Sequence, residues 1–146
     1  MIYRAMTIDD YDSVYQLWLS CTGMGLNDLD DSREGIAAFL DRNPATCFVC
    51  IDKDAVVGVI IAGHDGRRGY IYHTAVSPEH RRRGIGKGLA DHALIALRNE
   101  GINKVAMLVF ARNEVGNAFW EHEGFAARTD VVYRNKALAD LIRLDT

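Results

Sequence analysis

Residues 70–101 read YIYHTAVSPEHRRRGIGKGLADHALIALRNEG and decide the fold. The first seven are apolar, aromatic or β-branched, which predicts a strand that ends at Ser77-Pro78. After the glycines, apolar residues recur at helical spacing, at Leu89, Ala93, Leu94 and Leu97. Gly101 is typical of a helix end. The stretch therefore predicts a strand, a loop rich in glycine and arginine, and an amphipathic helix.

The loop between this strand and this helix suits an anion. The first turn of a helix has backbone N–H groups without intrahelical partners, and the helix dipole adds positive potential there. Gly84 and Gly86 have no Cβ, so a phosphate can approach the main chain closely. Four cationic side chains add charge, namely Arg81, Arg82, Arg83 and Lys87. A pyrophosphate is the ligand that this combination favours.

Two familiar phosphate motifs do not fit the loop. A Walker loop needs four residues between its glycines and a hydroxyl after the lysine, and neither condition holds at Lys87. The dinucleotide fingerprint needs a third glycine where the chain has Leu89. The following predicted strand, residues 104–110, also ends without a ribose-binding acid.

The loop carries the pattern V-x-P-x-x-R-R-x-G-x-G from Val76 to Gly86. Between a strand and a helix, this pattern resembles the coenzyme A loop of the GCN5-related N-acetyltransferases (GNAT), here in a small, single-domain, bacterial-type form. The resemblance implies that acetyl-CoA binds along the strand end and loop, at Ala75, Val76, Arg81, Arg82, Arg83, Gly84, Ile85, Gly86 and Lys87. A second pattern, N-x-x-x-N-A-F-W-x-x-x-G-F from residue 113, resembles the other GNAT signature. It implies further cofactor contacts at Asn113, Asn117, Phe119 and Trp120.

Composition predicts one soluble domain, residues 1–146, in the cytoplasm. The formal net charge is −3, which argues against nucleic acid as a partner and makes the arginine-rich loop a local cationic spot. Neither a membrane span nor a basic leader is apparent, so no membrane partner is expected. The predicted state is a monomer or homodimer.

The remaining sequence predicts an α/β fold with a mixed, largely antiparallel sheet of six to seven strands and helices on both faces. Strands are expected at residues 2–6, 46–52, 55–63 and 104–110, with a last one at Val131-Val132-Tyr133. Helices are expected from Tyr11, from a cap at Ser32, and over residues 113–122. Family resemblance implies a V-shaped opening between the strands at Tyr70 and Val105.

The cysteines predict no metal site. Their number is odd, and Cys47 and Cys50 lie three apart in a predicted strand, where their side chains face opposite sides. A core position is the expected role for both.

The reaction implied by the resemblance is direct attack of a free amine on the acetyl thioester in a ternary complex. The backbone N–H of Val76 suits the oxyanion. Trp120 stands where many relatives have a tyrosine acid, which leaves Tyr72 and Tyr133 as phenols that can protonate the thiolate, with solvent as the alternative. Tyr72 and His73 are the candidate bases on the strand. Because adjacent strand residues face opposite sides, at most one of these two is expected in the pocket.

The acceptor is expected near Trp18, Asn27, Asp28 and Tyr72, because the family places an acceptor loop after the first helix. A solvated acidic loop is the alternative for Asn27 and Asp28. Deprotonating a lysine amine at pH 7 costs about 4.6 kcal/mol, whereas an α-amino group costs about 1.4 kcal/mol. A site without a strand carboxylate therefore favours a small amine or a protein N-terminus. Arg67 and Arg68 either attract an acidic acceptor or solvate a turn.

Two other functions remain open from the sequence. A coenzyme A-binding sensor without catalysis fits the missing tyrosine and the missing carboxylate. An RNA-phosphate patch at residues 80–87 fits the local charge but not the acidic balance of the chain.

Overall fold

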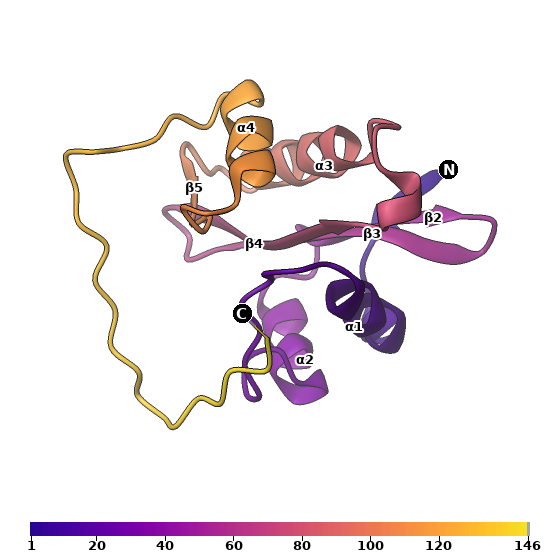
Figure 1. The fold of residues 1–146 in the computed structure, drawn as a ribbon, viewed down its shortest axis with the longest axis horizontal. Helices are drawn as coiled ribbons and strands as arrows, with labels where there is room; N and C mark the ends of the chain where they lie inside the picture. The colour runs from indigo at the N-terminus through magenta and orange to yellow at the C-terminus, as the bar shows by residue number, and fades with distance from the viewer. Residues whose placement is uncertain (146) are drawn as a thin grey trace.

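The computed structural model describes residues 1–145. Its sheet has five strands in the order β1-β2-β3-β4-β5 (Figure 1). All neighbouring pairs are antiparallel except β4 and β5, which are parallel. The strands are β1 Ile2–Ala5, β2 Phe48–Asp52, β3 Ala55–His64, β4 Gly69–Val76 and β5 Val105–Met107.

The predicted hairpin and meander are confirmed. β2 and β3 are joined by Lys53 and Asp54, both with positive φ, 49° and 67°. Two consecutive residues with positive φ match the twist of an antiparallel pair of strands, which explains the tight turn. β3 then pairs with β4 after the turn that contains Gly66.

Helices cover both faces of the sheet (Figure 1). On one face, α1 (Tyr11–Ser20) and α2 (Arg33–Arg42) share a core with Val49, Val59 and Ala75. On the other face, α3 (Ile85–Asn99) and α4 (Glu114–His122) share a core with Ile60 and Ile71. Short 3-10 turns precede α1 and α3, at Ile8–Asp10 and Pro78–His80. The Ser32 cap is confirmed, since its side chain accepts a hydrogen bond from the Gly35 N–H.

The predicted count of six to seven strands is wrong for the described residues. β5 is only three residues long, and Val131, Val132 and Tyr133 are exposed and outside any strand. Figure 1 shows the segment after α4 passing outside the sheet. The strand propensity of this segment is therefore not realised, because a strand forms only against a pairing edge that holds it.

The end of the chain returns to the loop between α1 and α2. Arg143 forms an isolated antiparallel bridge with Asn27, and the Leu144 N–H donates to the Leu26 carbonyl at 3.0 Å. The Asp145 carboxylate accepts hydrogen bonds from the N–H groups of Met24 and Leu26. The loop is thus fixed by residues more than a hundred positions away.

A β-bulge interrupts the pairing of β3 with β4. Ile60 pairs with Thr74 and Ala62 pairs with Ile71, so Tyr72 and His73 together oppose Ile61. A bulge of this kind places two residues against one and turns the following side chains over. Ile71 and Ala75 accordingly lie in the cores of opposite faces, although they are four positions apart, an even spacing that would otherwise put both on one face.

The cysteine prediction is confirmed in its geometry. Cys47 packs in the core under α1 and α2, and Cys50 packs in the core under α3. Burial raises the pKa of the Cys47 thiol to about 12, so this thiol stays protonated. Within residues 1–145, no helix has the length and apolar character of a membrane span.

The packing of α3 against the sheet yields a stability prediction. Leu89 is fully buried, whereas Ile95 on the same helix is 58% exposed. Leu89→Ala should lower the free energy of unfolding by about 2–5 kcal/mol, because it leaves a cavity beneath the loop. Ile95→Ala should change it by about 0.5 kcal/mol or less. Urea unfolding of both variants provides the measurement, and equal effects would contradict the packing.

Candidate active site

The site begins where β4 leaves β5. Pairing between them covers only Gly69 to Ile71 on β4, although β4 continues to Val76. On the other edge, the Ser77 N–H donates to the Val57 carbonyl at 2.8 Å. Hydrogen-bonded positions alternate along an antiparallel pair, so the N–H of Val76 points away from β3, toward the side that β5 has vacated. This N–H is the one that the sequence analysis put forward for the oxyanion.

The two loop glycines serve different purposes. Gly84 caps α3 with φ of 78° in the left-handed region, and a Cβ there would meet open space. Gly86 lies within the helix, and its Cβ would come within 3.2 Å of Phe119. Gly84 is therefore required by backbone conformation, and Gly86 by the close approach of α4.

The four loop cations do not act alike. Arg82 and Arg83 are exposed beside the N-terminus of α3. Arg81 turns back, with Nε 3.4 Å from the Val76 carbonyl and Nη2 3.7 Å from the Cys21 sulfur. Lys87 lies 3.1 Å from Asp91, whose hydrogen bond raises the pKa of the lysine. Arg82 and Arg83 are thus the side chains most available to a phosphate.

Thr74 is a feature that the sequence did not single out. Its hydroxyl is buried and finds no hydrogen-bond partner among residues 1–145. It lies on β4 two residues before Val76, within the part of the strand that β5 leaves unpaired. A buried polar atom without a partner costs free energy, so this hydroxyl fits a ligand that brings polar groups to the strand.

The second motif shapes the N-terminus of α4. Asn113 accepts a hydrogen bond from the Gly116 N–H, and Asn117 donates to the carbonyls of Phe110 and Asn113. Phe119 packs between Gly86 and Trp120, and Trp120 is buried. These four residues therefore shape α4 and its contact with the glycine-rich loop at Gly86. Ala75 and Ile85 bury their side chains in the cores, so they can meet a ligand only through their main chains.

His73 contacts a carboxylate on the face of the sheet that α1 and α2 cover. Its Nε2 lies 2.7 Å from the Asp31 carboxylate, and both side chains are largely buried. An ionised carboxylate only accepts hydrogen bonds, so Nε2 is the donor in this contact. Asp31 is held in turn by the Asn27 N–H at 2.8 Å. Asp31 comes from the loop before α2, and no local pattern marks it.

The expectation that Tyr72 and His73 face opposite sides of the sheet is wrong. Tyr72 contacts Phe39 of α2, and His73 contacts Trp18 of α1 with ring centroids 5.0 Å apart. Both therefore lie on the face of α1 and α2, because the bulge places them together. Trp18 is fully buried and supports His73 rather than facing open space.

The predicted acceptor residues Asn27 and Asp28 already accept hydrogen bonds from main-chain N–H groups of the protein. The side-chain oxygen Oδ1 of Asn27 accepts hydrogen bonds from the Leu29 and Asp30 N–H groups. An Asp28 carboxylate oxygen accepts one from the Ile142 N–H at 2.6 Å. Both side chains shape the loop that carries Asp31.

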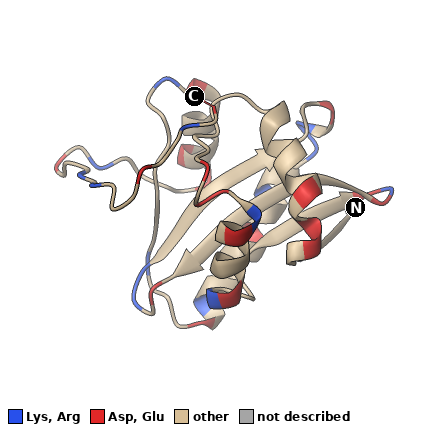
Figure 2. Ribbon diagram, turned by 90° about the horizontal axis from the view of Figure 1, so that it is seen from below, with Lys and Arg blue, Asp and Glu red and all other residues tan. Residues whose placement is uncertain are grey.

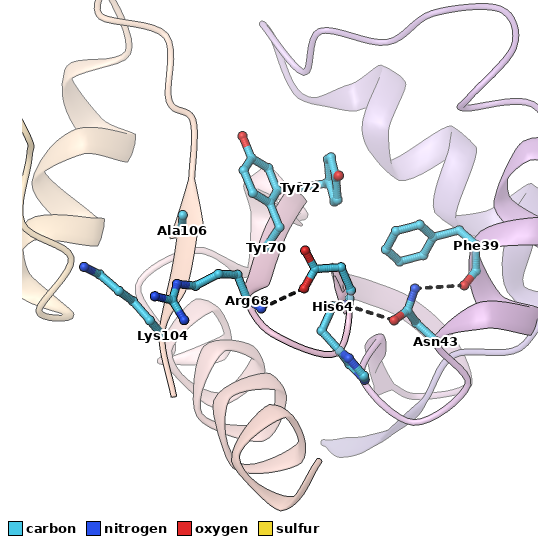
Figure 3. Close-up of a pocket in the computed structure, with 11 residues that line it drawn as sticks. Phe39, Asn43, His64, Arg68, Tyr70, Tyr72, Lys104 and Ala106 are labelled. Carbon is cyan, nitrogen blue, oxygen red and sulfur yellow. Dashed lines mark hydrogen bonds between the residues drawn. The ribbon is translucent and has the colours of Figure 1, made fainter. Parts of the chain in front are cut away.

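A cavity of about 520 Å³ opens beside Tyr72, at the N-terminal ends of β4 and β5. Figure 3 shows Tyr70, Tyr72 and Phe39 around it, with Arg68 and Lys104 also on its wall. Burial, with smaller effects of Tyr133 and Tyr72, raises the pKa of Tyr70 to about 12. Burial, followed by Asp30 and Tyr133, raises the pKa of Tyr72 as well. Both phenols therefore stay protonated near neutral pH.

Tyr133 belongs to the exposed segment after α4, yet its phenol influences both tyrosines of this cavity. Its hydroxyl accepts a hydrogen bond from Asn135 at 3.2 Å. Among residues 1–145, no group of three or more metal-binding side chains converges.

Comparison with known proteins identifies the class. The family model of the acetyltransferase (GNAT) family matches residues 11–125. An acetyltransferase of Sodalis glossinidius is 29% identical over 140 residues, covering 96% of this chain and 97% of that protein. The chain therefore belongs to the GNAT acetyltransferase family, and the family and fold together support an acyltransferase that uses an acyl-CoA.

Solved structures share the fold. The PaiA N-acetyltransferase of Thermoplasma acidophilum, in complex with coenzyme A, has a TM-score of 0.76 at 18% identity, covering 87% of this chain and 90% of that one. The ribosomal-protein-S18-alanine N-acetyltransferase of Escherichia coli has a TM-score of 0.73 at 19% identity, covering 88% and 79%.

The two ends of α3 provide a controlled test of the loop. Gly84 and Gly101 both have φ near 80° and open space at the Cβ position. Each Gly→Ala variant should lose about 1–2 kcal/mol of stability from the left-handed conformation. Only Gly84→Ala should also weaken coenzyme A binding, by several-fold in calorimetric titration. Equal weakening by Gly101→Ala would mean that the loss is global rather than local.

Proposed function

We propose that the protein transfers acetyl from acetyl-CoA to a free amine by direct attack in a ternary complex. The observation that carries this proposal is the position of the His73–Asp31 pair, three residues before the outward-facing N–H of Val76. The candidate base His73 and the candidate oxyanion donor, the N–H of Val76, thus lie on one strand, beyond the part of β4 that pairs with β5. The unpartnered hydroxyl of Thr74 lies between them.

The roles follow from the atoms available. Acetyl-CoA would bring an activated thioester to β4, with Arg82, Arg83 and the amides at the start of α3 holding its phosphates. The N–H of Val76 stabilises the negative oxygen that develops on the acetyl carbon. Three extended residues span about 10 Å, so His73 accepts the proton of the amine through intervening water. Tyr72, protonated at neutral pH, is the donor for the departing thiolate, with Tyr133 as the alternative.

An α-amino group is the favoured acceptor. Its deprotonation costs less than that of a lysine side chain, which suits a histidine base. The S18-alanine N-acetyltransferase of Escherichia coli, which shares the fold, is named for an alanine acceptor on a protein. A protein N-terminus or a small amine of similar basicity is therefore the proposed substrate.

The cofactor is tested by the thermal midpoint of unfolding. At a hundred times its dissociation constant, acetyl-CoA should stabilise the folded protein by about 2.7 kcal/mol, which is a shift of several degrees. NAD and ATP at equal concentration should give no comparable shift. A shift with ATP alone, or with none of the three, would overturn the proposal.

The base is tested by His73→Gln. We expect kcat to fall by about 10²–10⁴-fold, while the acetyl-CoA thermal shift is retained. His122→Gln is the matched control, because the His122 side chain on α4 is 86% exposed. Wild-type protein that binds acetyl-CoA but acetylates no amine would instead indicate a coenzyme A sensor.

A further inference from the structure

Asp145 differs in burial from the segment that leads to it. Residues 126–144 are all exposed, whereas Asp145 is half-buried. Figure 2 shows Lys and Arg as well as Asp and Glu along this segment, so it carries charges of both signs in contact with solvent. Its course is therefore fixed where it leaves α4 and where residues 142–145 contact the loop after α1.

The Asp145 carboxylate binds two main-chain amides of that loop. One oxygen accepts a hydrogen bond from the Met24 N–H at 3.0 Å, and the other accepts one from the Leu26 N–H. Hydrogen bonds from N–H groups to an ionised carboxylate are roughly twice as strong as those between neutral groups. Gly23 and Gly25 lie beside these amides with positive φ, so the loop is weakly restrained by its own sequence. Asp145 thus fixes a stretch that would otherwise have many conformations.

The same stretch contacts both sides of the opening between β4 and β5. The Cys21 sulfur lies 3.7 Å from the Val76 carbonyl at the end of β4. A Cβ on Gly25 would lie 3.4 Å from the ring of Phe110, which follows β5 by three residues. Residues 21–25 therefore connect the end of β4, where the thioester is proposed to lie, with the segment after β5.

The contacts continue from this stretch to the candidate base. Asn27 donates its N–H to one Asp31 carboxylate oxygen at 2.8 Å. The other oxygen lies 2.7 Å from Nε2 of His73. Because Asp31 is only 4% exposed, the orientation of its carboxylate depends on the protein groups that contact it. A displacement of the Asn27 amide would therefore turn the carboxylate that contacts His73.

From these contacts we infer that Asp145 is a positioning residue for acetyl transfer, acting through other residues rather than on the reacting atoms. By holding the loop after α1, it fixes the Asn27 amide, which orients Asp31 and hence His73. The inference rests on the proposed role of His73 as the base and adds a residue far from it in sequence.

Steady-state kinetics at saturating acetyl-CoA, with alaninamide and penta-alanine amide as α-amines, test this role. Asp145→Ala should lower kcat about tenfold, because small displacements of a catalytic group have effects of this order or larger. Asp145→Asn keeps one side-chain oxygen as an acceptor and should therefore lose less activity than Asp145→Ala. Asp140→Ala is the matched control, since Asp140 is an exposed aspartate on the same segment. It should leave kcat within about twofold of wild type.

A double-mutant cycle separates a positioning role from a general structural one. In the His73→Gln background, Asp145→Ala should lower kcat by less than about twofold, because the group through which Asp145 acts is already absent. If the two single losses multiply instead, Asp145 acts independently of His73 and the inference is wrong.

Amide hydrogen exchange follows the same path without requiring turnover. Asp145→Ala should speed exchange at Met24 and Leu26, which lose their acceptor. It should also speed exchange at Asn27, whose N–H is bonded to Asp31. Faster exchange at Met24 and Leu26 alone would mean that the disturbance does not reach Asp31, which contradicts the inference.

The outcomes distinguish the inference from the proposed function. The acetyl-CoA thermal shift should be equal in all variants, because the cations proposed to hold the phosphates, Arg82 and Arg83, lie at the start of α3. An unchanged kcat in Asp145→Ala would overturn the inference and leave the acetyltransferase proposal standing. Binding of acetyl-CoA by the wild type without acetylation of either amine would overturn both.

Discussion

The separation of β4 from β5 is the constraint on which the site depends. A parallel pair satisfies the main-chain groups that the two strands turn toward each other, but here pairing stops at Ile71 and Met107. The rest of β4 keeps its antiparallel partner on one edge only. Main-chain groups of this segment, and the hydroxyl of Thr74, are therefore left for a ligand to satisfy.

Sequence reasoning succeeded where the information is local. The strand, glycine loop and helix over residues 70–101 follow from periodicity and from helix-end chemistry, and the structure has each of them. The hairpin at Lys53 and the cap at Ser32 are also short-range features. Such features depend on neighbours within a few residues, so their spacing in the sequence is sufficient.

It failed where the contacts are distant. The bulge at Tyr72 and His73 is a mismatch of register with β3, which no pattern within β4 reveals. Asp31 becomes a partner of His73 only when α1, the loop and the sheet are packed together. The strand expected at Val131 has suitable residues, yet strand formation depends on a pairing edge as well as on propensity.

The path of the last residues connects these distant features. The loop after α1 contains Gly23 and Gly25, both with positive φ, so its own sequence restrains it weakly. The Asp145 carboxylate binds two of its amides, and main-chain bonds from Ile142 and Leu144 continue the contact. The same loop places Asp31 against His73. Because the anchor lies at residues 142–145, the long exposed segment after α4 needs only to span the distance from α4 to this loop. The orientation of His73 thus depends on residues that are far from it in sequence.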